Sequence, residues 1–297
     1  MIRLALALGF VAAGTTMTAD PPHLLTWAEL TSRPRPARDA VLRYGTEPYQ
    51  QVDLWLPKGP GLHPVVVMVH GGCWQTAIAD RTLMDWIADD LRRHGIAVWN
   101  IDYRGVDRPG AGYPGTFADV AAAADMLRDV APRYHLDPHR VVAVGHSAGG
   151  HLALWLAARH RLPRSSALWS TDPLPIKAVV SLGGLPDLEA TAASPDNGCG
   201  TEVVARLTGA ATAAHPDVFA DTSVPRLLPL GVPQHLVNGA LDRIIPARMA
   251  PAYVKAARAA GDVATLDTVE DTGHAELVAP ETRAWAVARQ RITEALK

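Results

Sequence analysis

The sequence has almost no net charge and no long run of charges of one sign. Its 28 Lys and Arg residues and 30 Asp and Glu residues give a formal net charge of −2 over 297 residues. A protein that binds nucleic acid or docks on an anionic membrane surface carries a basic patch or stripe. We therefore expect no nucleic-acid partner, and instead a small-molecule substrate or an accessible polymeric one.

Cysteine is scarce, because the chain contains only Cys73 and Cys199. In an oxidising compartment two cysteines permit one disulfide, but their spacing does not imply it. Two free thiols are the alternative. No His and Cys residues have the spacing of zinc ligands, so we expect neither a metal nor another cofactor.

A hydrophobic run long enough to cross a membrane is also missing. Residues 4–13 are almost wholly apolar and follow a single positive charge at Arg3, but the run is too short for a bilayer. Small residues follow as far as Ala19, a pattern typical of a secretory signal peptide cleaved after Gly14 or Ala19. The alternative is an N-terminal helix that simply packs. We expect a signal peptide at 1–19, a domain at 20–297, no stable membrane insertion, and a periplasmic or secreted protein.

Strand-like and helix-like segments alternate from residue 41 onward. Residues 41–45 and 51–56 alternate apolar and polar positions, which predicts half-exposed strands at a sheet edge. Continuous apolar runs are typical of strands buried on both faces of a parallel sheet; they lie at 65–69, 96–101, 141–144, 177–182 and 235–237, with a weaker candidate at 264–269. Helical patterns lie at 81–94, 117–134, 149–160, 247–260 and 280–296. The order predicts an α/β fold with a mostly parallel, doubly wound sheet and helices on both faces.

One segment interrupts this alternation. Residues 185–233 contain no clear strand and are rich in Ala, Thr, Asp and Pro, with one short helix expected at 202–207. A long irregular insertion in a compact domain is usually a functional lid or a disordered loop. We find no internal repeat or low-complexity linker, so we expect one domain with a short inserted cap.

The candidate nucleophile is Ser147, in the sequence Gly-His-Ser-Ala-Gly at 145–149. A match to G-x-S-x-G is weak on its own. Here a buried strand precedes it and a helix follows, which is the context of a nucleophile elbow that presents a serine at the tip of a strand. The alternative is a glycine-rich turn that binds phosphate at the helix N-terminus.

A second glycine-rich turn, His-Gly-Gly-Cys-Trp at 70–74, follows the first fully buried strand. Acyl transfer needs backbone N–H groups directed at the developing oxyanion, and glycines let the backbone approach a substrate. We expect the oxyanion hole from Gly71, Gly72 and the N–H of Ala148. His70 is interpreted as structural, and Trp74 as either a wall of the substrate pocket or a core residue.

The general base and the acid that orients it should follow in the order Ser, acid, His. Asp242 comes just after a short buried strand, and His274 comes after the last strand candidate. In this hypothesis His274 takes the proton of Ser147 while Asp242 fixes the other ring nitrogen. Alternative acids are Asp187, Asp267 and Asp271.

These residues resemble the α/β-hydrolase fold over almost the whole predicted mature chain. The motifs HGGCW at 70–74, DYRG at 102–105, GHSAGG at 145–150, GALDRIIP at 239–246 and DTGH at 271–274 carry the resemblance. They are similar to bacterial carboxylesterases related to hormone-sensitive lipase, feruloyl esterases and kynurenine formamidases, and to the catalytic domain of prolyl oligopeptidases. The resemblance implies the triad and oxyanion hole named above. Cys73 stands where the lipase-like version often has glycine, which places it at the substrate pocket. The DYRG stretch is interpreted as a structural turn.

Three functions fit these patterns. Hydrolysis of a carboxylic ester through an acyl-enzyme is favoured, with a small-molecule or carbohydrate-linked ester as substrate. An amidohydrolase of the arylformamidase or peptidase type is the alternative, although the chain has no room for the propeller domain of an oligopeptidase. A non-catalytic binding module on the same fold is disfavoured, since Ser147, Asp242 and His274 are all present.

Overall fold

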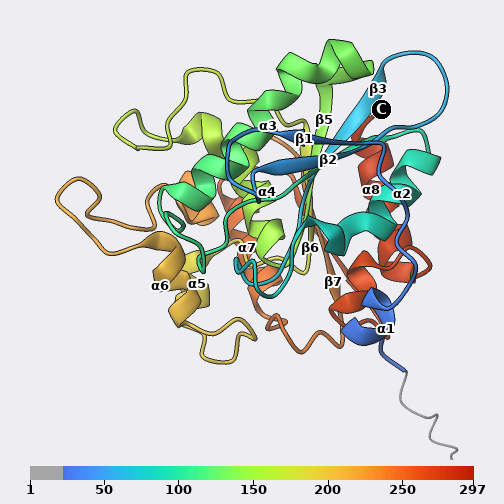
Figure 1. Cartoon of the computed structure of the whole chain (residues 1–297). Helices are drawn as coiled ribbons and strands as arrows, with labels where there is room; N and C mark the ends of the chain where they lie inside the picture. Colours follow the sequence, from blue (N-terminus) through green and yellow to red (C-terminus); the bar gives the residue numbers. More distant parts are fainter. Residues whose placement is uncertain (1–22) are drawn as a thin grey trace, which may run out of the picture.

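The computed structural model describes residues 23–297, which form an eight-stranded sheet flanked by helices (Figure 1). The expected signal peptide at 1–19 lies outside the described residues. The strands are β1 (Ala40–Arg43), β2 (Gln51–Trp55), β3 (His63–Val69), β4 (Ala97–Ile101), β5 (Leu136–His146), β6 (Ala178–Leu182), β7 (Gln234–Gly239) and β8 (Ala264–Val269). Every strand expected from the sequence is therefore present.

The helices follow the predicted segments, with additional short ones. The α-helices are α1 (Trp27–Thr31), α2 (Asp85–Arg93), α3 (Gly115–Tyr134), α4 (Ala148–Ala158), α5 (Leu188–Ala192), α6 (Glu202–Thr208), α7 (Met249–Ala259) and α8 (Arg283–Ala295). Short 3₁₀-helices are η1 (Arg81–Met84), η2 (Arg159–Arg161), η3 (Val224–Leu227) and η4 (Ala275–Val278). The sequence did not predict α1 or α5, because five residues are too few to show a helical period.

The strands lie in the order β1-β2-β4-β3-β5-β6-β7-β8. The pairs β1–β2 and β2–β4 are antiparallel, and all other neighbours are parallel. The expected mostly parallel α/β architecture is thus confirmed. Because the carboxyl ends of parallel strands meet at one edge, the loops after β3, β5, β6, β7 and β8 gather there.

Successive residues of the central strands face two separate cores. On β3, Val65, Val67 and Val69 belong to the core that includes residues of α3, α4 and α7, whereas Val66 and Met68 belong to the core that includes residues of α2 and α8. Figure 1 shows these two sets of helices on opposite faces of the sheet. Both faces of the strand are apolar because both are covered, which explains the unbroken hydrophobic runs in the sequence.

The expectation for the first two strands is only partly right. β1 is the edge strand and alternates between half-buried and exposed positions. β2 lies one place inward, and Asp53 in it is fully buried, where it pairs with Arg81 at 2.9 Å and Arg38 at 3.3 Å. The polar residue in the alternating pattern, Asp53, therefore takes part in an internal ion pair and does not face solvent.

Residues 185–233 hold α5, α6 and η3, and Figure 1 places α5 and α6 side by side at one margin of the molecule. The helix expected at 202–207 is present as α6. Leu188, Val204 and Leu207 join the core on the α4 side of the sheet. The segment is thus anchored by apolar side chains rather than lying loose over the surface.

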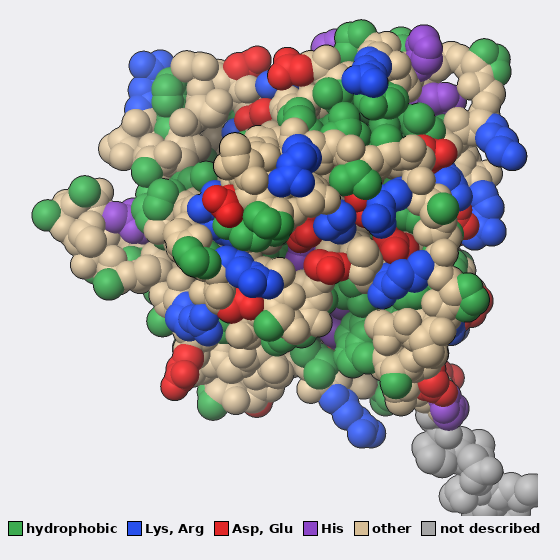
Figure 2. All heavy atoms as spheres, viewed as in Figure 1, with side chains coloured by type: hydrophobic (Ala, Val, Ile, Leu, Met, Phe, Trp, Pro, Cys, Tyr) green, Lys and Arg blue, Asp and Glu red, His purple; other side chains and the backbone are tan. Residues whose placement is uncertain are grey.

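The surface shown in Figure 2 carries basic and acidic side chains interspersed, with no broad field of one sign. This agrees with the nearly balanced composition. Within residues 23–297, none of the helices combines the length and the apolar character that a membrane crossing requires.

Candidate active site

Ser147 lies in a sharp turn between β5 and α4, with φ 54° and ψ −122°. Its N–H donates to the carbonyl of Leu182 over 2.8 Å, which ties the turn to β6. A Cβ on Gly149 would lie 2.1 Å from the carbonyl oxygen of Val69, and one on Gly145 would lie 2.0 Å from the oxygen of Gly149. Glycine at both positions therefore lets β3, β5 and α4 converge, and the turn holds Ser147 in a conformation that L-residues rarely adopt.

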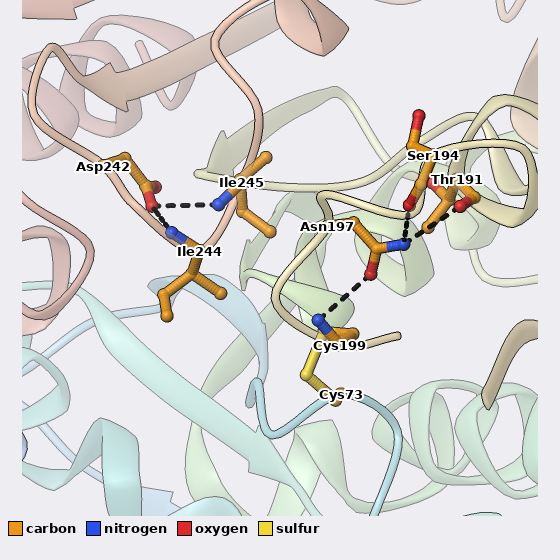
Figure 3. The surroundings of a disulfide bond; sticks show 8 residues. All are labelled: Cys73, Thr191, Ser194, Asn197, Cys199, Asp242, Ile244 and Ile245. Atoms are coloured by element: carbon orange, nitrogen blue, oxygen red, sulfur yellow. Dashed lines mark hydrogen bonds between the residues drawn. A yellow bond between two sulfur atoms is a disulfide. The ribbon is translucent and has the colours of Figure 1, made fainter. Parts of the chain in front are cut away.

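Asp242 and His274 follow β7 and β8 and are joined directly. Nδ1 of His274 donates to Oδ2 of Asp242 over 2.7 Å, and the side chains are 5% and 3% exposed respectively. The second oxygen of Asp242 accepts the backbone N–H groups of Ile244 and Ile245 at 2.8 and 3.0 Å (Figure 3). These bonds fix the carboxylate so that it can orient the imidazole and stabilise its protonated form.

Ser147 and His274 face the same cavity, which has a volume of about 360 Å³. Nε2 of His274 is buried and has no hydrogen-bond partner within residues 23–297. The imidazole reaches this position across the end of β6, where a Cβ on Gly183 would lie only 3.1 Å from two of its ring atoms. The geometry leaves one imidazole nitrogen available to a reacting group at Ser147.

We call this the active-site cavity and define it by its lining residues. They are Trp27, Thr31, Gly72, Cys73, Ile78, Ala79, Leu83, His146, Ser147, Gly198, Ile244 and His274. The lining contains no Asp, Glu, Lys or Arg side chain. A cavity of this composition suits an uncharged, mainly apolar substrate.

The glycine-rich turn after β3 borders this cavity through Gly72 and Cys73. Both residues have positive φ, 100° and 51°, and their N–H groups donate to no backbone carbonyl in the described part of the chain. Gly71 instead packs beneath the elbow, since a Cβ on it would lie 2.7 Å from Nδ1 of His146 and 3.1 Å from Cβ of Ser147. Of the two glycines expected to supply oxyanion donors, Gly72 thus lines the cavity and Gly71 does not, while Ala148 begins α4 with an N–H that has no intrahelical partner.

His70 and the DYRG stretch hold this turn from below. The ring nitrogens of His70 lie 2.7 Å from the carbonyl oxygen of Gly71 and 3.0 Å from the carboxylate of Asp102, and the ring stacks on Tyr103 at 4.3 Å. Asp102 also accepts from Arg81 at 2.8 Å. Both His70 and Asp102 are buried away from the active-site cavity, as the structural interpretation of each expected.

His146, the residue before Ser147, is buried and contacts His274. Its ring centre lies 4.4 Å from that of His274, and its Nε2 donates to the carbonyl oxygen of His274 over 3.2 Å. Burial lowers the pKa of His146 well below its ordinary value, and the neighbouring His274 lowers it further. His146 is therefore a neutral donor that holds the backbone of His274.

A disulfide joins Cys73 to Cys199, with the two Cα atoms 5.3 Å apart (Figure 3). The sequence permitted this bond without implying it. Next to Cys199, the N–H of Gly198 donates to the carbonyl of Ile244 over 2.7 Å, in the loop whose N–H groups bind Asp242. The disulfide thus connects the turn after β3, the 185–233 segment and the acid loop.

The two tryptophans near the cavity have different roles. Trp74 is fully buried and packs edge-on against His151 at 5.7 Å, so it belongs to the core and is not the pocket wall that was one of its two expected roles. Its φ of 55° accompanies a reversal of the chain at Cys73 and Trp74. Trp27 of α1 forms the wall instead, and no periodicity or motif in the sequence pointed to it.

The alternative acids are engaged elsewhere or lie apart from His274. Asp187 caps α5 by accepting the N–H of Ala190 at 3.0 Å, and Asp267 pairs with Arg291 at 2.9 Å. Asp271 is exposed in the turn after β8. Of the four candidates, only Asp242 makes a hydrogen bond to His274 in the structure. Within residues 23–297, His, Cys, Asp and Glu side chains nowhere gather in a group of three that would hold a metal ion.

Sequence comparison relates the chain to esterases. Esterase LipC of Mycobacterium tuberculosis is 29% identical over 224 residues, which cover 73% of this chain and 54% of LipC. Isoprenylcysteine alpha-carbonyl methylesterase ICME of Arabidopsis thaliana is 32% identical over 149 residues, which cover 48% of this chain and 33% of ICME. The matched regions therefore span about half or less of these curated relatives.

Structural comparison shows the fold. A truncated carbohydrate esterase from gut microbiota superposes with a TM-score of 0.71 at 20% identity, covering 89% of this chain and 99% of that one. An inhibited esterase B from Lactobacillus rhamnosus superposes with a TM-score of 0.74 at 19% identity, covering 91% of each chain. The α/β-hydrolase fold expected from the motifs is thereby confirmed. The model of the BD-FAE family matches residues 52–255, more than half of the sequence, and the chain belongs to this family.

Proposed function

We propose that the protein is a serine hydrolase that cleaves carboxylic esters through an acyl-enzyme. The observation that carries the proposal is the shared cavity of Ser147 and His274, with His274 held by Asp242 at 2.7 Å. A nucleophile, a base and an orienting acid in this arrangement are the parts that acyl transfer needs. The esterases among the relatives support the same reaction.

In the proposed first step Oγ of Ser147 attacks the ester carbonyl carbon while Nε2 of His274 takes its proton. The carbonyl oxygen becomes an oxyanion, which the N–H groups of Gly72, Cys73 and Ala148 would bind. The intermediate collapses as the C–O bond to the alcohol breaks, and His274 gives the proton to the departing oxygen. Water then attacks the acyl-enzyme by the same sequence and releases the acid.

The substrate is proposed to be an uncharged small-molecule ester or an ester carried on a carbohydrate. The uncharged lining supports the first part, and one structural neighbour is described as a carbohydrate esterase. We further propose that the protein is exported to the periplasm or beyond. The disulfide supports an oxidising compartment, since such bonds are rare in reducing ones.

The test is a panel of p-nitrophenyl esters, a feruloyl ester and N-formylkynurenine, assayed with wild type, Ser147→Ala and the matched control Ser165→Ala. Ser165 is exposed, so its variant should behave as wild type. We expect ester hydrolysis that falls by more than about 10³-fold in Ser147→Ala, and labelling of Ser147 alone by a fluorophosphonate. Full activity of Ser147→Ala would overturn the mechanism, and preference for N-formylkynurenine would overturn the ester assignment in favour of an amidohydrolase.

A further inference from the structure

Trp27 reaches the active-site cavity from a part of the chain that no motif includes. It is the first residue of α1, and 38% of its surface is exposed. Its ring centre lies 5.9 Å from that of His146 and 6.0 Å from that of His274, with interplanar angles of 69° and 81°. The indole therefore stands edge-to-face with the two histidines beside Ser147.

Trp27 is held near the loop that contains His274 by hydrogen bonds of the residues that flank it in the sequence. Glu276 is buried and accepts the N–H of Leu25 with one oxygen and the N–H of Gly273, the neighbour of His274, with the other at 3.0 Å. Thr26 and Glu29 form a capping box at the start of α1. Trp27 thus has a fixed place relative to His274, and it offers an apolar surface that loses little entropy when a ligand packs on it.

The chemistry of the proposed reaction identifies which part of a substrate meets this surface. His274 must give its proton to the departing alcohol oxygen, so the alcohol part lies on the side of His274. The carbonyl oxygen lies on the side of Gly72 and Cys73. Trp27 contacts the base, and it shares the cavity wall with Ile78, which is 60% exposed.

We propose that Trp27 is a specificity-determining residue that packs against the alcohol part of the substrate and selects esters of ring-bearing, uncharged alcohols. This rests on the proposed ester hydrolysis at Ser147. A flat indole in partial contact with solvent gains most from a second ring that packs on it. The absence of charged side chains from the lining directs the preference toward neutral alcohols.

The experiment compares kcat/KM for benzyl acetate and ethyl acetate, which share an acyl group, in wild type, Trp27→Ala and Trp27→Phe. Trp169→Ala is the matched control, since Trp169 is also partly exposed but does not line the cavity. We expect Trp27→Ala to lower the benzyl-to-ethyl ratio at least tenfold, Trp27→Phe to retain most of it and Trp169→Ala to leave it unchanged. The ratio for ethyl butyrate over ethyl acetate, which reports on the acyl side, should not change.

The outcomes separate this assignment from the reaction on which it rests. An active enzyme whose benzyl-to-ethyl ratio survives Trp27→Ala overturns the assignment alone, as does a change confined to the butyrate-to-acetate ratio. A wild type that cleaves none of these esters overturns the proposed function as well. Each result is a ratio of kcat/KM between two substrates of one variant. Partial unfolding of that variant lowers both values by the same factor and leaves the ratio unchanged.

Discussion

Removal of the Cys73–Cys199 disulfide should cost a large part of the free energy of unfolding. The bond closes a loop of 126 residues. In the chain-entropy model a loop of this length restricts the unfolded chain by about 5 kcal/mol at 25 °C. Since whole domains are stable by roughly 5–15 kcal/mol, we expect the double variant Cys73→Ser/Cys199→Ser to be folded but clearly weakened.

The assay is urea unfolding followed by tryptophan fluorescence, for which the chain has 8 tryptophans. Wild type, reduced wild type and the double variant are compared, and the reduced protein should match the variant. Thiol titration of unreduced wild type in denaturant comes first and should find no free thiol. Two free thiols, or a free energy of unfolding in the variant within about 1 kcal/mol of wild type, would refute the reasoning.

The double variant Cys73→Ser/Cys199→Ser should also lose activity under conditions in which it is still fully folded. The disulfide holds Cys73, which lines the active-site cavity and whose N–H is a proposed oxyanion donor, to the segment that binds the acid loop through Gly198 and Ile244. Loss of a well-placed oxyanion donor costs about 10²–10³-fold in kcat, so a loosened one should cost about tenfold. The effect should fall on kcat rather than KM, measured at a urea concentration well below the transition.

Two further predictions concern carboxylates. Asp242→Asn should lower kcat by about 10⁴-fold with little change in thermal stability, because an amide cannot stabilise the protonated imidazole; a loss below tenfold in ester assays would contradict the role of Asp242. Burial raises the pKa of Asp85 to about 7, and Arg35, at 3.2 Å, offsets this only in part. The stability from the neutral carboxyl group is therefore fully present below pH 3.8 and is lost progressively as the pH rises to 7, so Asp85→Asn should raise Tm relative to wild type at pH 8, and by less at pH 5. Equal Tm values for Asp85→Asn and wild type at pH 8 would contradict this.

Much of the fold and the order of the candidate triad could be predicted because both depend on local patterns. Strands buried on both faces are continuous apolar runs, and each of those runs is a strand. The approach of Gly149 to Val69 requires glycine, so the elbow is visible in the sequence. Residues at the ends of neighbouring parallel strands are necessarily close, which is why Asp242 and His274 could be paired from their positions alone.

The walls of the cavity could not be predicted, because they depend on contacts between distant segments. Trp74 is adjacent in sequence to the glycine-rich turn, yet the positive φ angles at Cys73 and Trp74 reverse the chain and bury the indole. Trp27 is far from every motif and reaches the site through the bond from Leu25 to Glu276, 251 residues away. The disulfide could not be predicted for the same reason. The positions of two cysteines in a sequence determine neither the distance between them nor their relative orientation.

The glycine pair after β6 is a feature of the sequence that indicates the site without belonging to a catalytic motif. Gly183 and Gly184 follow a buried strand, as Gly71 and Gly72 do, but no candidate catalytic side chain lies beside them in the sequence. In the structure Gly183 leaves the space through which His274 crosses β6 toward Ser147, and a Cβ would lie 3.1 Å from its ring. A glycine pair after a buried strand therefore indicates a close approach at that edge, whether of a substrate or of a side chain of the protein itself. The proposed order Ser, acid, His implies such a crossing, because β8, which precedes His274, is separated from β5, which precedes Ser147, by β6 and β7.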